Sequence, residues 1–316
     1  MSFSLSRILL AATASSALLI SACNDTADDI KSNTSKIKIE KMVETSNAQK
    51  IKREVNDTTP SLEIAAPAGE MEDRESEKGD AESSDVDDVE ASDPNQPYNA
   101  FLEKYLTAKN GLNLVRYEAV SAEDKATLKT YISMLEKTDW TTLEKNDEMA
   151  FWFNLYNAKT LDVVLDNYPV KSIKKINGRG PWKTKNMTVN GTEMSLDNIE
   201  HDTVRAKYDE PRVHYAFNCA SIGCPNLKMT AWEGETLDAE LTQAARDFIA
   251  SDRGVRVDGN DIEVSNIYKW YKEDFGDNEK SLKQHLATYA NADKKTAILN
   301  ADDIDYEYDW NLNIAK

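Results

Sequence analysis

Residues Glu148–Tyr168 read E-M-A-F-W-F-N-L-Y-N-A-K-T-L-D-V-V-L-D-N-Y and predict a long helix at the centre of the fold. Asn146 is a candidate N-cap, and Pro169 predicts the end of the helix because the residue before a proline is biased away from helical backbone. The apolar side chains cover nearly every direction around the axis, which is typical of a helix inside a core. They are Phe151, Trp152, Phe153, Leu155, Tyr156, Leu161, Val163, Val164 and Leu165.

Two asparagines interrupt this apolar surface. Asn154 and Asn157 lie three residues apart and therefore share one face of the helix. A buried amide without hydrogen-bond partners destabilises a protein, so both side chains should be paired. They either tie down neighbouring backbone or line a polar cleft.

The flanking sequence alternates helical patterns with hairpins and predicts an α+β class. Ser121 predicts the N-cap of a helix that precedes the central one, and residues 237–250 carry another helical apolar stripe. Hairpin turns are expected at Asn190-Gly191 and at Asp258-Gly259-Asn260, and side chains alternate again from Ile304 to Leu312. We expect one globular domain over residues 97–316, with the central helix packed against antiparallel strands and hairpins.

A second informative stretch is Val213–Leu227, V-H-Y-A-F-N-C-A-S-I-G-C-P-N-L. Alternation up to Asn218 predicts a strand with His214 and Asn218 on one face, and a loop follows that carries Cys219 and Cys224. Polar and nucleophilic residues placed where a strand runs into a loop often build a site. A turn pinned by a disulfide is the competing interpretation.

The helix predicted just before this stretch carries further titratable residues. Asp197 and Glu200 have the spacing of a capping pair, and His201 follows directly. Asp197 and His201 are four residues apart, so they should lie on the same face of the helix.

The N-terminus has the pattern of a targeting segment rather than of folded structure. Arg7 precedes the apolar run Ile8–Ile20, and I-S-A-C ends at Cys23. This resembles a bacterial lipobox, which implies a signal peptide over residues 1–22 and lipidation of Cys23. An ordinary secretory signal or a retained anchor is the alternative. We therefore expect a protein of the bacterial cell envelope that faces the periplasm or the cell surface, with the lipid bilayer as its partner.

Residues 24–96 have few aromatics and no sustained apolar period, which predicts a disordered acidic linker. The chain carries a formal net charge of −18, and the 12 acidic and two basic residues from Glu70 to Asp93 account for −10 of it. No concentrated basic face is evident, so we do not expect a nucleic-acid partner.

Four motifs together resemble the domain of unknown function 547 family: F-W-F-N-L-Y-N-A at 151–158, S-L-D-N-I-E-H at 195–201, H-Y-A-F-N-C-A-S-I-G-C-P-N-L at 214–227 and Y-D-W-N-L-N at 308–313. The resemblance spans roughly Leu143–Ile249 and implies no activity. It carries over to Asn154, Asn157, Glu200, His201, His214, Asn218, Cys219, Cys224 and Pro225.

One functional hypothesis is a cysteine-dependent hydrolase or acyltransferase. Cys219 would be the nucleophile, although Cys224 is an alternative, and His214 or His201 would be the base. Glu200 or Asp197 would orient that base, and Asn218 or loop amides would bind the oxyanion. Each residue also has a purely structural interpretation, such as a core histidine or a helix cap.

The alternative is a non-catalytic envelope binding module in which Cys219 and Cys224 form a disulfide, as an exported location permits. Its ligand, a small molecule or a peptide, is not specified by the sequence. A zinc site from His201, His214, Cys219 and Cys224 is disfavoured because the spacings match no zinc motif. We expect no metal and no cofactor.

Overall fold

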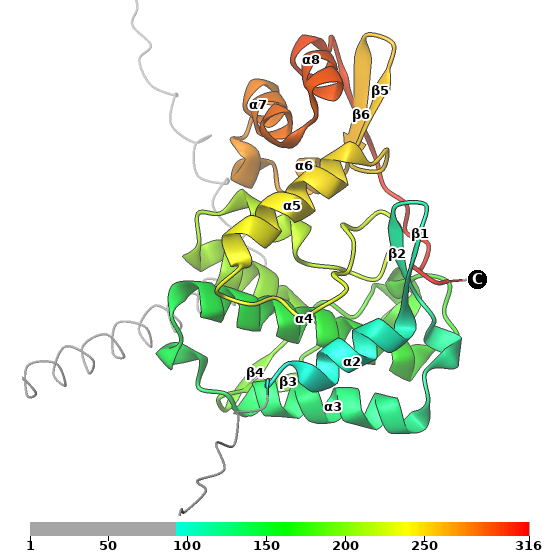
Figure 1. Cartoon of the computed structure of the whole chain (residues 1–316), viewed down its shortest axis with the longest axis vertical. Coiled ribbons are helices and arrows are strands. Elements are labelled where there is room, and N and C mark those ends of the chain that lie inside the picture. Colours follow the sequence, from blue (N-terminus) through cyan, green and yellow to red (C-terminus); the bar gives the residue numbers. More distant parts are fainter. Residues whose placement is uncertain (1–92, 316) are drawn as a thin grey trace, which may run out of the picture.

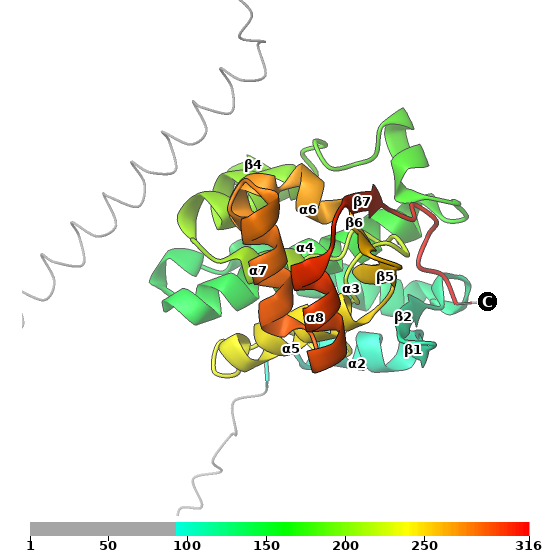
Figure 2. The same ribbon diagram turned by 90° about the horizontal axis from the view of Figure 1, so that it is seen from above.

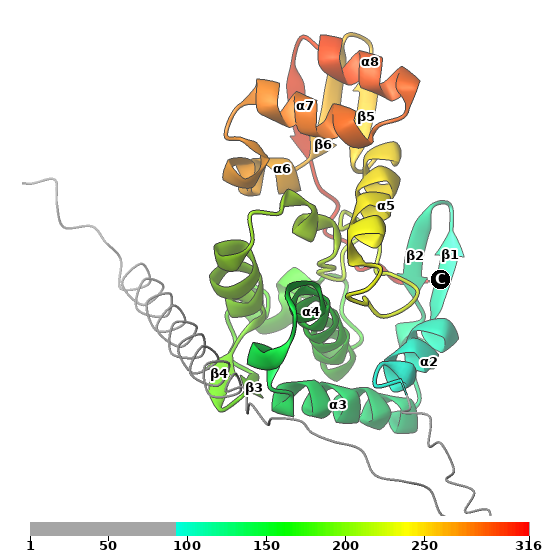
Figure 3. The same cartoon turned by 60° about the vertical axis from the view of Figure 1, so that its left-hand side comes forward.

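The computed structural model describes residues 93–315 and has a mixed α+β fold with small sheets. Helix α4 (Lys145–Asn167) runs through the middle of the molecule, as Figure 1 shows from the side and Figure 3 nearly end-on. From Glu148 to Leu165 every residue of α4 except Lys159 is buried. The prediction of a central buried helix is confirmed, because side chains apolar in all directions need neighbours on all sides.

The predicted start of α4 is displaced by two residues. Glu144 has the extended N-cap backbone and the helix begins at Lys145, so Asn146 lies in the first turn and does not cap it. The helix ends at Asn167, just before Tyr168 and Pro169, as the proline predicts.

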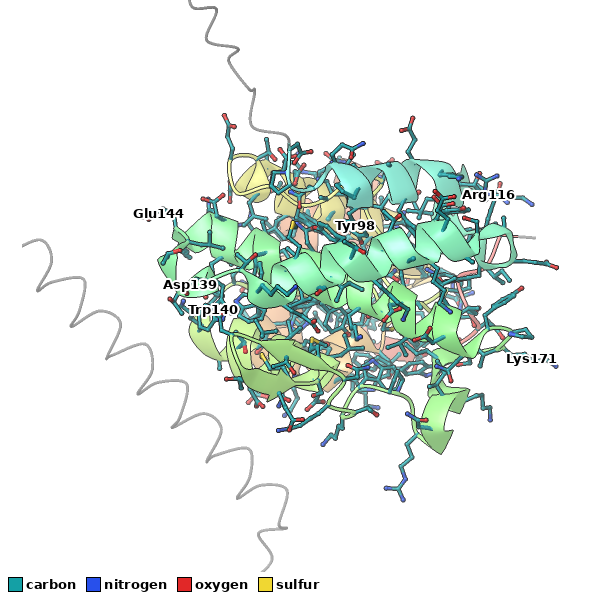
Figure 4. All side chains as sticks on the ribbon, turned by 90° about the horizontal axis from the view of Figure 1, so that it is seen from below. Tyr98, Arg116, Asp139, Trp140, Glu144 and Lys171 are labelled. Carbon is teal, nitrogen blue, oxygen red and sulfur yellow. The ribbon has the colours of Figure 1, made fainter. Side chains whose placement is uncertain are left out.

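Two helices cover one side of α4, which Figure 4 shows from below. They are α2 (Gln96–Tyr105) and α3 (Ala122–Lys137). Ser121 caps α3 as predicted, by accepting the Asp124 N–H at 3.0 Å, and Leu128, Tyr131, Ile132 and Leu135 are its buried residues. Asp139 and Trp140 lie beside Glu144 in Figure 4, where the chain turns back, and Lys171 lies at the opposite end. Helices α3 and α4 are therefore antiparallel neighbours.

Two hairpins flank this helical layer. Strands β1 (Leu106–Lys109) and β2 (Leu112–Val115) form one, and β3 (Met187–Val189) and β4 (Thr192–Met194) form the other. The second hairpin turns at Asn190 and Gly191, whose φ angles are 46° and 75°. Two consecutive positive φ angles are what a type I′ turn requires, so this prediction is confirmed.

A second, smaller core lies above α4 in Figure 1. It is built from α5 (Leu237–Ala250), α6 (Ile267–Trp270), α7 (Glu279–Tyr289), α8 (Ala292–Asn300) and a sheet of β5 (Val255–Asp258), β6 (Asp261–Ser265) and β7 (Ile304–Glu307). Strands β5 and β6 form the predicted hairpin, whereas β6 and β7 are parallel. The strand predicted to Leu312 ends at Glu307.

Short helical turns link these elements: η1 (Tyr117–Ala119), η2 (Trp140–Thr142), η3 (Ile173–Gly178), the π-helix η4 (Asn198–Arg205), η5 (Pro211–Tyr215) and η6 (Lys272–Phe275). The strand predicted over Val213–Asn218 is wrong, because Val213–Tyr215 belong to η5 and the rest has no regular structure. Val213 to Asn218 are buried without exception. The alternation distinguishes a polar from an apolar face, but neighbouring residues cover both.

The signal peptide, Cys23 and nearly all of the predicted linker lie outside the described residues. Of that linker the structure describes Asp93–Gln96, and Gln96 already opens α2. Among residues 93–315, no helix combines the length and the apolar character needed to cross a membrane.

Candidate functional site

A pocket of about 610 Å³ opens between the two cores, at the side of α4. Both cysteines and both predicted histidines line it, with Glu200. Most of the remaining wall is aromatic, and several charged residues lie at its edge. These other lining residues are Tyr156, Arg179, Gly180, Trp182, Lys183, Asp197, Phe217, Pro225, Ile267, Trp270, Tyr271, Tyr308 and Trp310.

The two cysteines form a hydrogen-bonded pair on this pocket wall. The Cys219 N–H donates to Cys224 Sγ at 3.0 Å, and both are free thiols. The hydroxyl of Tyr308 lies 3.1 Å from Cys219 Sγ and 3.0 Å from Cys224 Sγ. A single phenol therefore bridges both sulfur atoms.

The backbone around Cys224 favours a thiolate there. Ala220 has a φ of 59°, which is uncommon for a residue other than glycine, and the backbone N–H groups on either side of it, those of Cys219 and Ser221, hydrogen-bond the Cys224 sulfur. Burial alone would raise the pKa of Cys224, but hydrogen bonds from Cys219, Tyr308 and the Ser221 backbone outweigh it and lower that pKa. The pKa of Cys219 is raised well above its ordinary value, because it shares a hydrogen bond with Cys224 and is buried.

Asn218 holds the cysteine loop in shape instead of facing the pocket. Its side-chain Nδ2 donates to the Pro225 carbonyl at 2.8 Å, and its Oδ1 accepts the Ala220 N–H at 2.9 Å. Asn218 is buried and is not among the residues that line the pocket, so this geometry does not support its predicted oxyanion role.

The C-terminal chain closes the other side of the loop. The Ile222 N–H donates to the Asn311 carbonyl and the Gly223 N–H to the Asp309 carbonyl, both at 2.8 Å. A Cβ on Gly223 would lie 2.9 Å from the Asp309 nitrogen and from the ring of Tyr308, so only glycine allows this approach. This close approach of the two chain segments places the Tyr308 hydroxyl next to both sulfur atoms. Beyond it the chain descends in Figure 1 to the β1–β2 hairpin.

His214 lies deep in the wall and is paired with a carboxylate. Its Nε2 donates to Asp274 Oδ2 at 2.6 Å, and its ring stacks on Tyr271 with centroids 4.2 Å apart. Burial lowers the pKa of His214, which the hydrogen bond to Asp274 offsets only in part. The Nε2 proton of His214 therefore faces Asp274, and neither ring nitrogen hydrogen-bonds a cysteine among residues 93–315.

His201 is held by Arg205. The guanidinium Nη1 donates to His201 Nδ1 at 2.8 Å, and because an arginine N–H can only donate, the ring proton must be on Nε2. That Nε2 lies 3.6 Å from Asp197 Oδ1, on the helix face that the sequence predicted. Arg205 also donates to Asp274 at 2.5 and 3.0 Å. The two histidines are thus joined through Arg205 and Asp274 rather than to the thiols.

Glu200 is a buried carboxylate that does not orient a histidine. Its Oε2 accepts the Tyr156 hydroxyl at 3.1 Å, and burial together with the charge of Glu200 raises the pKa of both Tyr156 and Tyr271. The orienting acids are Asp274 for His214 and Asp197 for His201. Asp197 also makes no capping hydrogen bond, so the predicted capping pair is wrong.

Asn154 and Asn157 lie outside the pocket, which corrects their assignment as cleft-lining residues. Asn154 bonds both the N–H and the carbonyl of Trp232, at 2.8 and 2.9 Å. Asn157 donates to the Ala216 carbonyl and accepts the Asn218 N–H, both at 2.9 Å. Both amides therefore tie neighbouring backbone to α4, which is the structural alternative that the sequence also offered.

The sequence did not single out Tyr308, Asp274, Arg205 or the tryptophans as site residues. Tyr308 was part of the motif Y-D-W-N-L-N but was assigned to a strand. Asp274 is 60 residues from His214, and no local pattern links the two. In the part of the chain that the structure describes, no three His, Cys, Asp or Glu side chains form a group able to hold a metal ion.

Residues 140–249 match the model of a family described as "Protein of unknown function, DUF547". The match falls on the segment expected from the motifs and contains α4, both predicted histidines and both cysteines of the pair. It ends before Asp274 and Tyr308. No curated protein and no solved structure matches the chain.

Proposed function

We propose that this protein is a cysteine-dependent hydrolase or acyltransferase whose nucleophile is Cys224, held at the cell envelope by a lipid on Cys23. The observation that carries the proposal is the environment of Cys224 Sγ. It accepts the Cys219 N–H, lies 3.0 Å from the Tyr308 hydroxyl and faces a large pocket. A thiolate is the reactive form of cysteine, and this environment favours it.

The reaction begins with the attack of the Cys224 thiolate on an acyl carbonyl carbon. An S–C bond forms, the bond from the carbonyl carbon to the leaving oxygen or nitrogen breaks, and a thioester results. The leaving group takes a proton from the Cys219 thiol, whose raised pKa keeps it protonated, or from the Tyr308 hydroxyl. Water, or an acceptor alcohol or amine, then attacks the thioester and restores the thiolate and the donated proton.

This scheme needs no histidine to deprotonate the nucleophile. His201 lines the pocket with its ring proton on Nε2, 3.6 Å from Asp197 Oδ1, and we assign this N–H as the donor to a developing oxyanion. His214 and Asp274 position Arg205, which in turn holds His201. Cys219 donates the proton to the leaving group, and the scheme does not use the histidine base, His214 or His201, that the sequence predicts.

The test is the pH dependence of thiol alkylation, with each labelled cysteine identified by peptide mapping. Wild-type protein should alkylate Cys224 with an apparent pKa below about 8.5. Tyr308→Phe should raise that pKa by roughly one unit, because the thiolate loses one hydrogen bond. Hydrolysis of p-nitrophenyl butyrate should fall on the order of a hundredfold or more in Cys224→Ser.

A second variant, Cys219→Ala, keeps the backbone N–H that Cys224 accepts but removes the thiol hydrogen bond, so the pKa of Cys224 should rise while Cys224 remains the labelled residue. If Cys224 alkylates only above pH 9 while Cys219 reacts first, the assignment of the nucleophile is overturned. If neither Cys224→Ser nor Cys219→Ala changes ester hydrolysis, the proposal fails as a whole.

The alternative is a binding module with a Cys219–Cys224 disulfide, and one observation favours it. Both sulfur atoms lie within 3.1 Å of the same Tyr308 oxygen, so they are near one another. Counting free thiols on protein isolated without reductant separates the two functions. Two thiols released only by reductant would support the binding module.

A further inference from the structure

We infer that the pocket takes an acidic polysaccharide, with the chain's O-acyl esters as the groups presented to the thiols. This inference rests on the proposed function and names the substrate class of that same site. Two observations support the inference: a basic segment lies at the edge of the pocket, and tryptophans form part of the pocket wall.

The chain between α4 and β3 is basic in an otherwise acidic protein. Residues 171–185 contain six cations, and the first acidic residue after Asp166 is Glu193. All six are exposed, and none forms an ion pair with another described residue. They are Lys171, Lys174, Lys175, Arg179, Lys183 and Lys185.

This basic segment, residues 171–185, borders the pocket. Arg179 and Lys183 are among the pocket-lining residues, and Lys174 Nζ lies 4.5 Å from the ring centroid of Trp310. In Figure 2 the segment stands out on the same side of the molecule as β7. A negatively charged chain lying along this edge, outside the pocket carboxylates Asp197 and Glu200, would therefore meet several unpaired cations at once, which raises association by electrostatic attraction.

Three indoles form an aromatic shelf: Trp182, Trp270 and Trp310. Trp310 packs against Trp182 at 5.8 Å and against Trp270 at 5.4 Å between ring centroids. Trp270 keeps 42% of its surface exposed although it lines the pocket. An exposed indole beside a recess gives the C–H face of a sugar ring a flat apolar surface to stack on, while the ring hydroxyls stay in water.

An acidic polysaccharide fits this combination better than an acidic peptide does. An extended peptide adds to free backbone groups of a strand edge. At this pocket, however, the N–H groups of Ile222 and Gly223 already donate to the C-terminal chain. The accessible features are ring faces and cationic side chains, which suit repeating sugar rings that carry carboxylates.

Tyr308 links the aromatic shelf to the two thiols. Its ring packs against Trp270 at 4.8 Å and against Trp310 at 4.6 Å, and its hydroxyl reaches both sulfur atoms. A sugar on the shelf would place an ester substituent at Cys224. The thiolate takes the acyl group, the sugar hydroxyl leaves with a proton from Cys219, and water releases the acid and restores the thiol.

The experiment measures binding of polygalacturonate to the full chain by calorimetry, at low and at high salt. We expect saturable binding that weakens at least tenfold in Lys174→Gln/Arg179→Gln/Lys183→Gln and at high salt, and that also weakens in Trp270→Ala. The matched control is Lys109→Gln/Lys280→Gln/Lys295→Gln, which removes three other exposed and unpaired cations and should bind like the wild type. Unfolding midpoints confirm that each variant folds.

Neutral dextran, polyglutamate and phosphatidylglycerol vesicles discriminate the competing ligands. Equal binding of polyglutamate or of the vesicles would overturn the assignment to a polysaccharide, as would equal loss of binding in the control triple variant. Hydrolysis of p-nitrophenyl butyrate is followed separately. Polymer binding without any Cys224-dependent hydrolysis would refute the proposed function, whereas hydrolysis without polymer binding would refute only the substrate class.

Discussion

At the scale of single residues, one arginine, Arg205, holds the two histidines of the pocket, and neither histidine is paired with a cysteine. Arg205 donates to His201 and to Asp274, and its guanidinium lies 4.7 Å from the ring centroid of Tyr271. Asp274 in turn accepts from His214. The sequence predicts that a histidine acts as the base for a cysteine, because both residue types are rare in this chain. In the structure His214 instead pairs with Asp274, 60 residues away in the chain.

Substitution of Asp274→Asn should destabilise the protein by about 2 kcal/mol, since it leaves Arg205 with only the exposed Glu273 as a carboxylate partner and weakens the partner of buried His214. Burial alone would raise the pKa of Asp274, but His214 and Arg205 hold it well below the usual value. Ionised Asp274 therefore stabilises the folded protein at pH values above about 4, the pKa of an aspartate in the unfolded chain. This stabilisation is lost as the pH falls and the carboxylate becomes protonated. Urea unfolding at pH 7 measures the effect.

Asp277→Asn is the matched control, because its salt bridge to Lys272 is more than 60% exposed on both sides and should contribute little. Equal losses in the two variants would contradict the role given to Asp274.

At the scale of elements, α4 fixes the cysteine loop from the inside of the core. Asn157 bonds backbone groups of Ala216 and Asn218, and Asn218 then shapes the loop up to Pro225. The position of Cys224 therefore depends on an amide that does not touch the pocket. The helix was predictable from its apolar pattern, but the targets of its two asparagines lie 59 to 78 residues away.

Asn157→Ala should cost about 2–4 kcal/mol, because it leaves the Ala216 carbonyl and the Asn218 N–H buried without partners. It should also slow Cys224 alkylation by displacing the loop. Asn167→Ala, at the end of the same helix, removes one bond to its own helix and should cost under about 1 kcal/mol. Denaturant midpoints of both variants provide the comparison. Unchanged alkylation in a folded Asn157→Ala protein would show that the loop holds its shape independently.

At the scale of the whole molecule, the chain passes between the two cores at η5, where Val213 and Ala216 belong to the larger core and Tyr215 to the smaller one. The Tyr215 hydroxyl lies 2.8 Å from His285 Nε2 on α7 and 3.3 Å from the Tyr268 hydroxyl. Burial lowers the pKa of His285 to about 4, with the nearby charge of His214 adding to the effect. The folded protein therefore keeps His285 neutral at pH values above about 4.

This junction predicts acid sensitivity. Between pH 6.5 and 4 the unfolded chain binds a proton at His285 that the folded chain does not, so stability rises with pH in this window and falls as the pH decreases. From pH 7.5 to pH 5 the loss due to His285 should be about 2 kcal/mol. Urea unfolding across that range measures it. His285→Gln cannot titrate and should lose this part of the pH dependence; an unaltered pH profile in that variant would refute the assignment.

The sequence by itself determined the α+β class, the central helix, both hairpin turns and the segment that carries the cysteine pair. These features follow from periodicity and turn chemistry, which act between residues close in the chain. Tertiary structure decided that Val213–Asn218 is not a strand, that Asn154, Asn157 and Asn218 serve the backbone, and that Tyr308 and Asp274 belong to the site. Those outcomes depend on burial from both sides and on hydrogen bonds between distant residues, neither of which leaves a local pattern in the sequence.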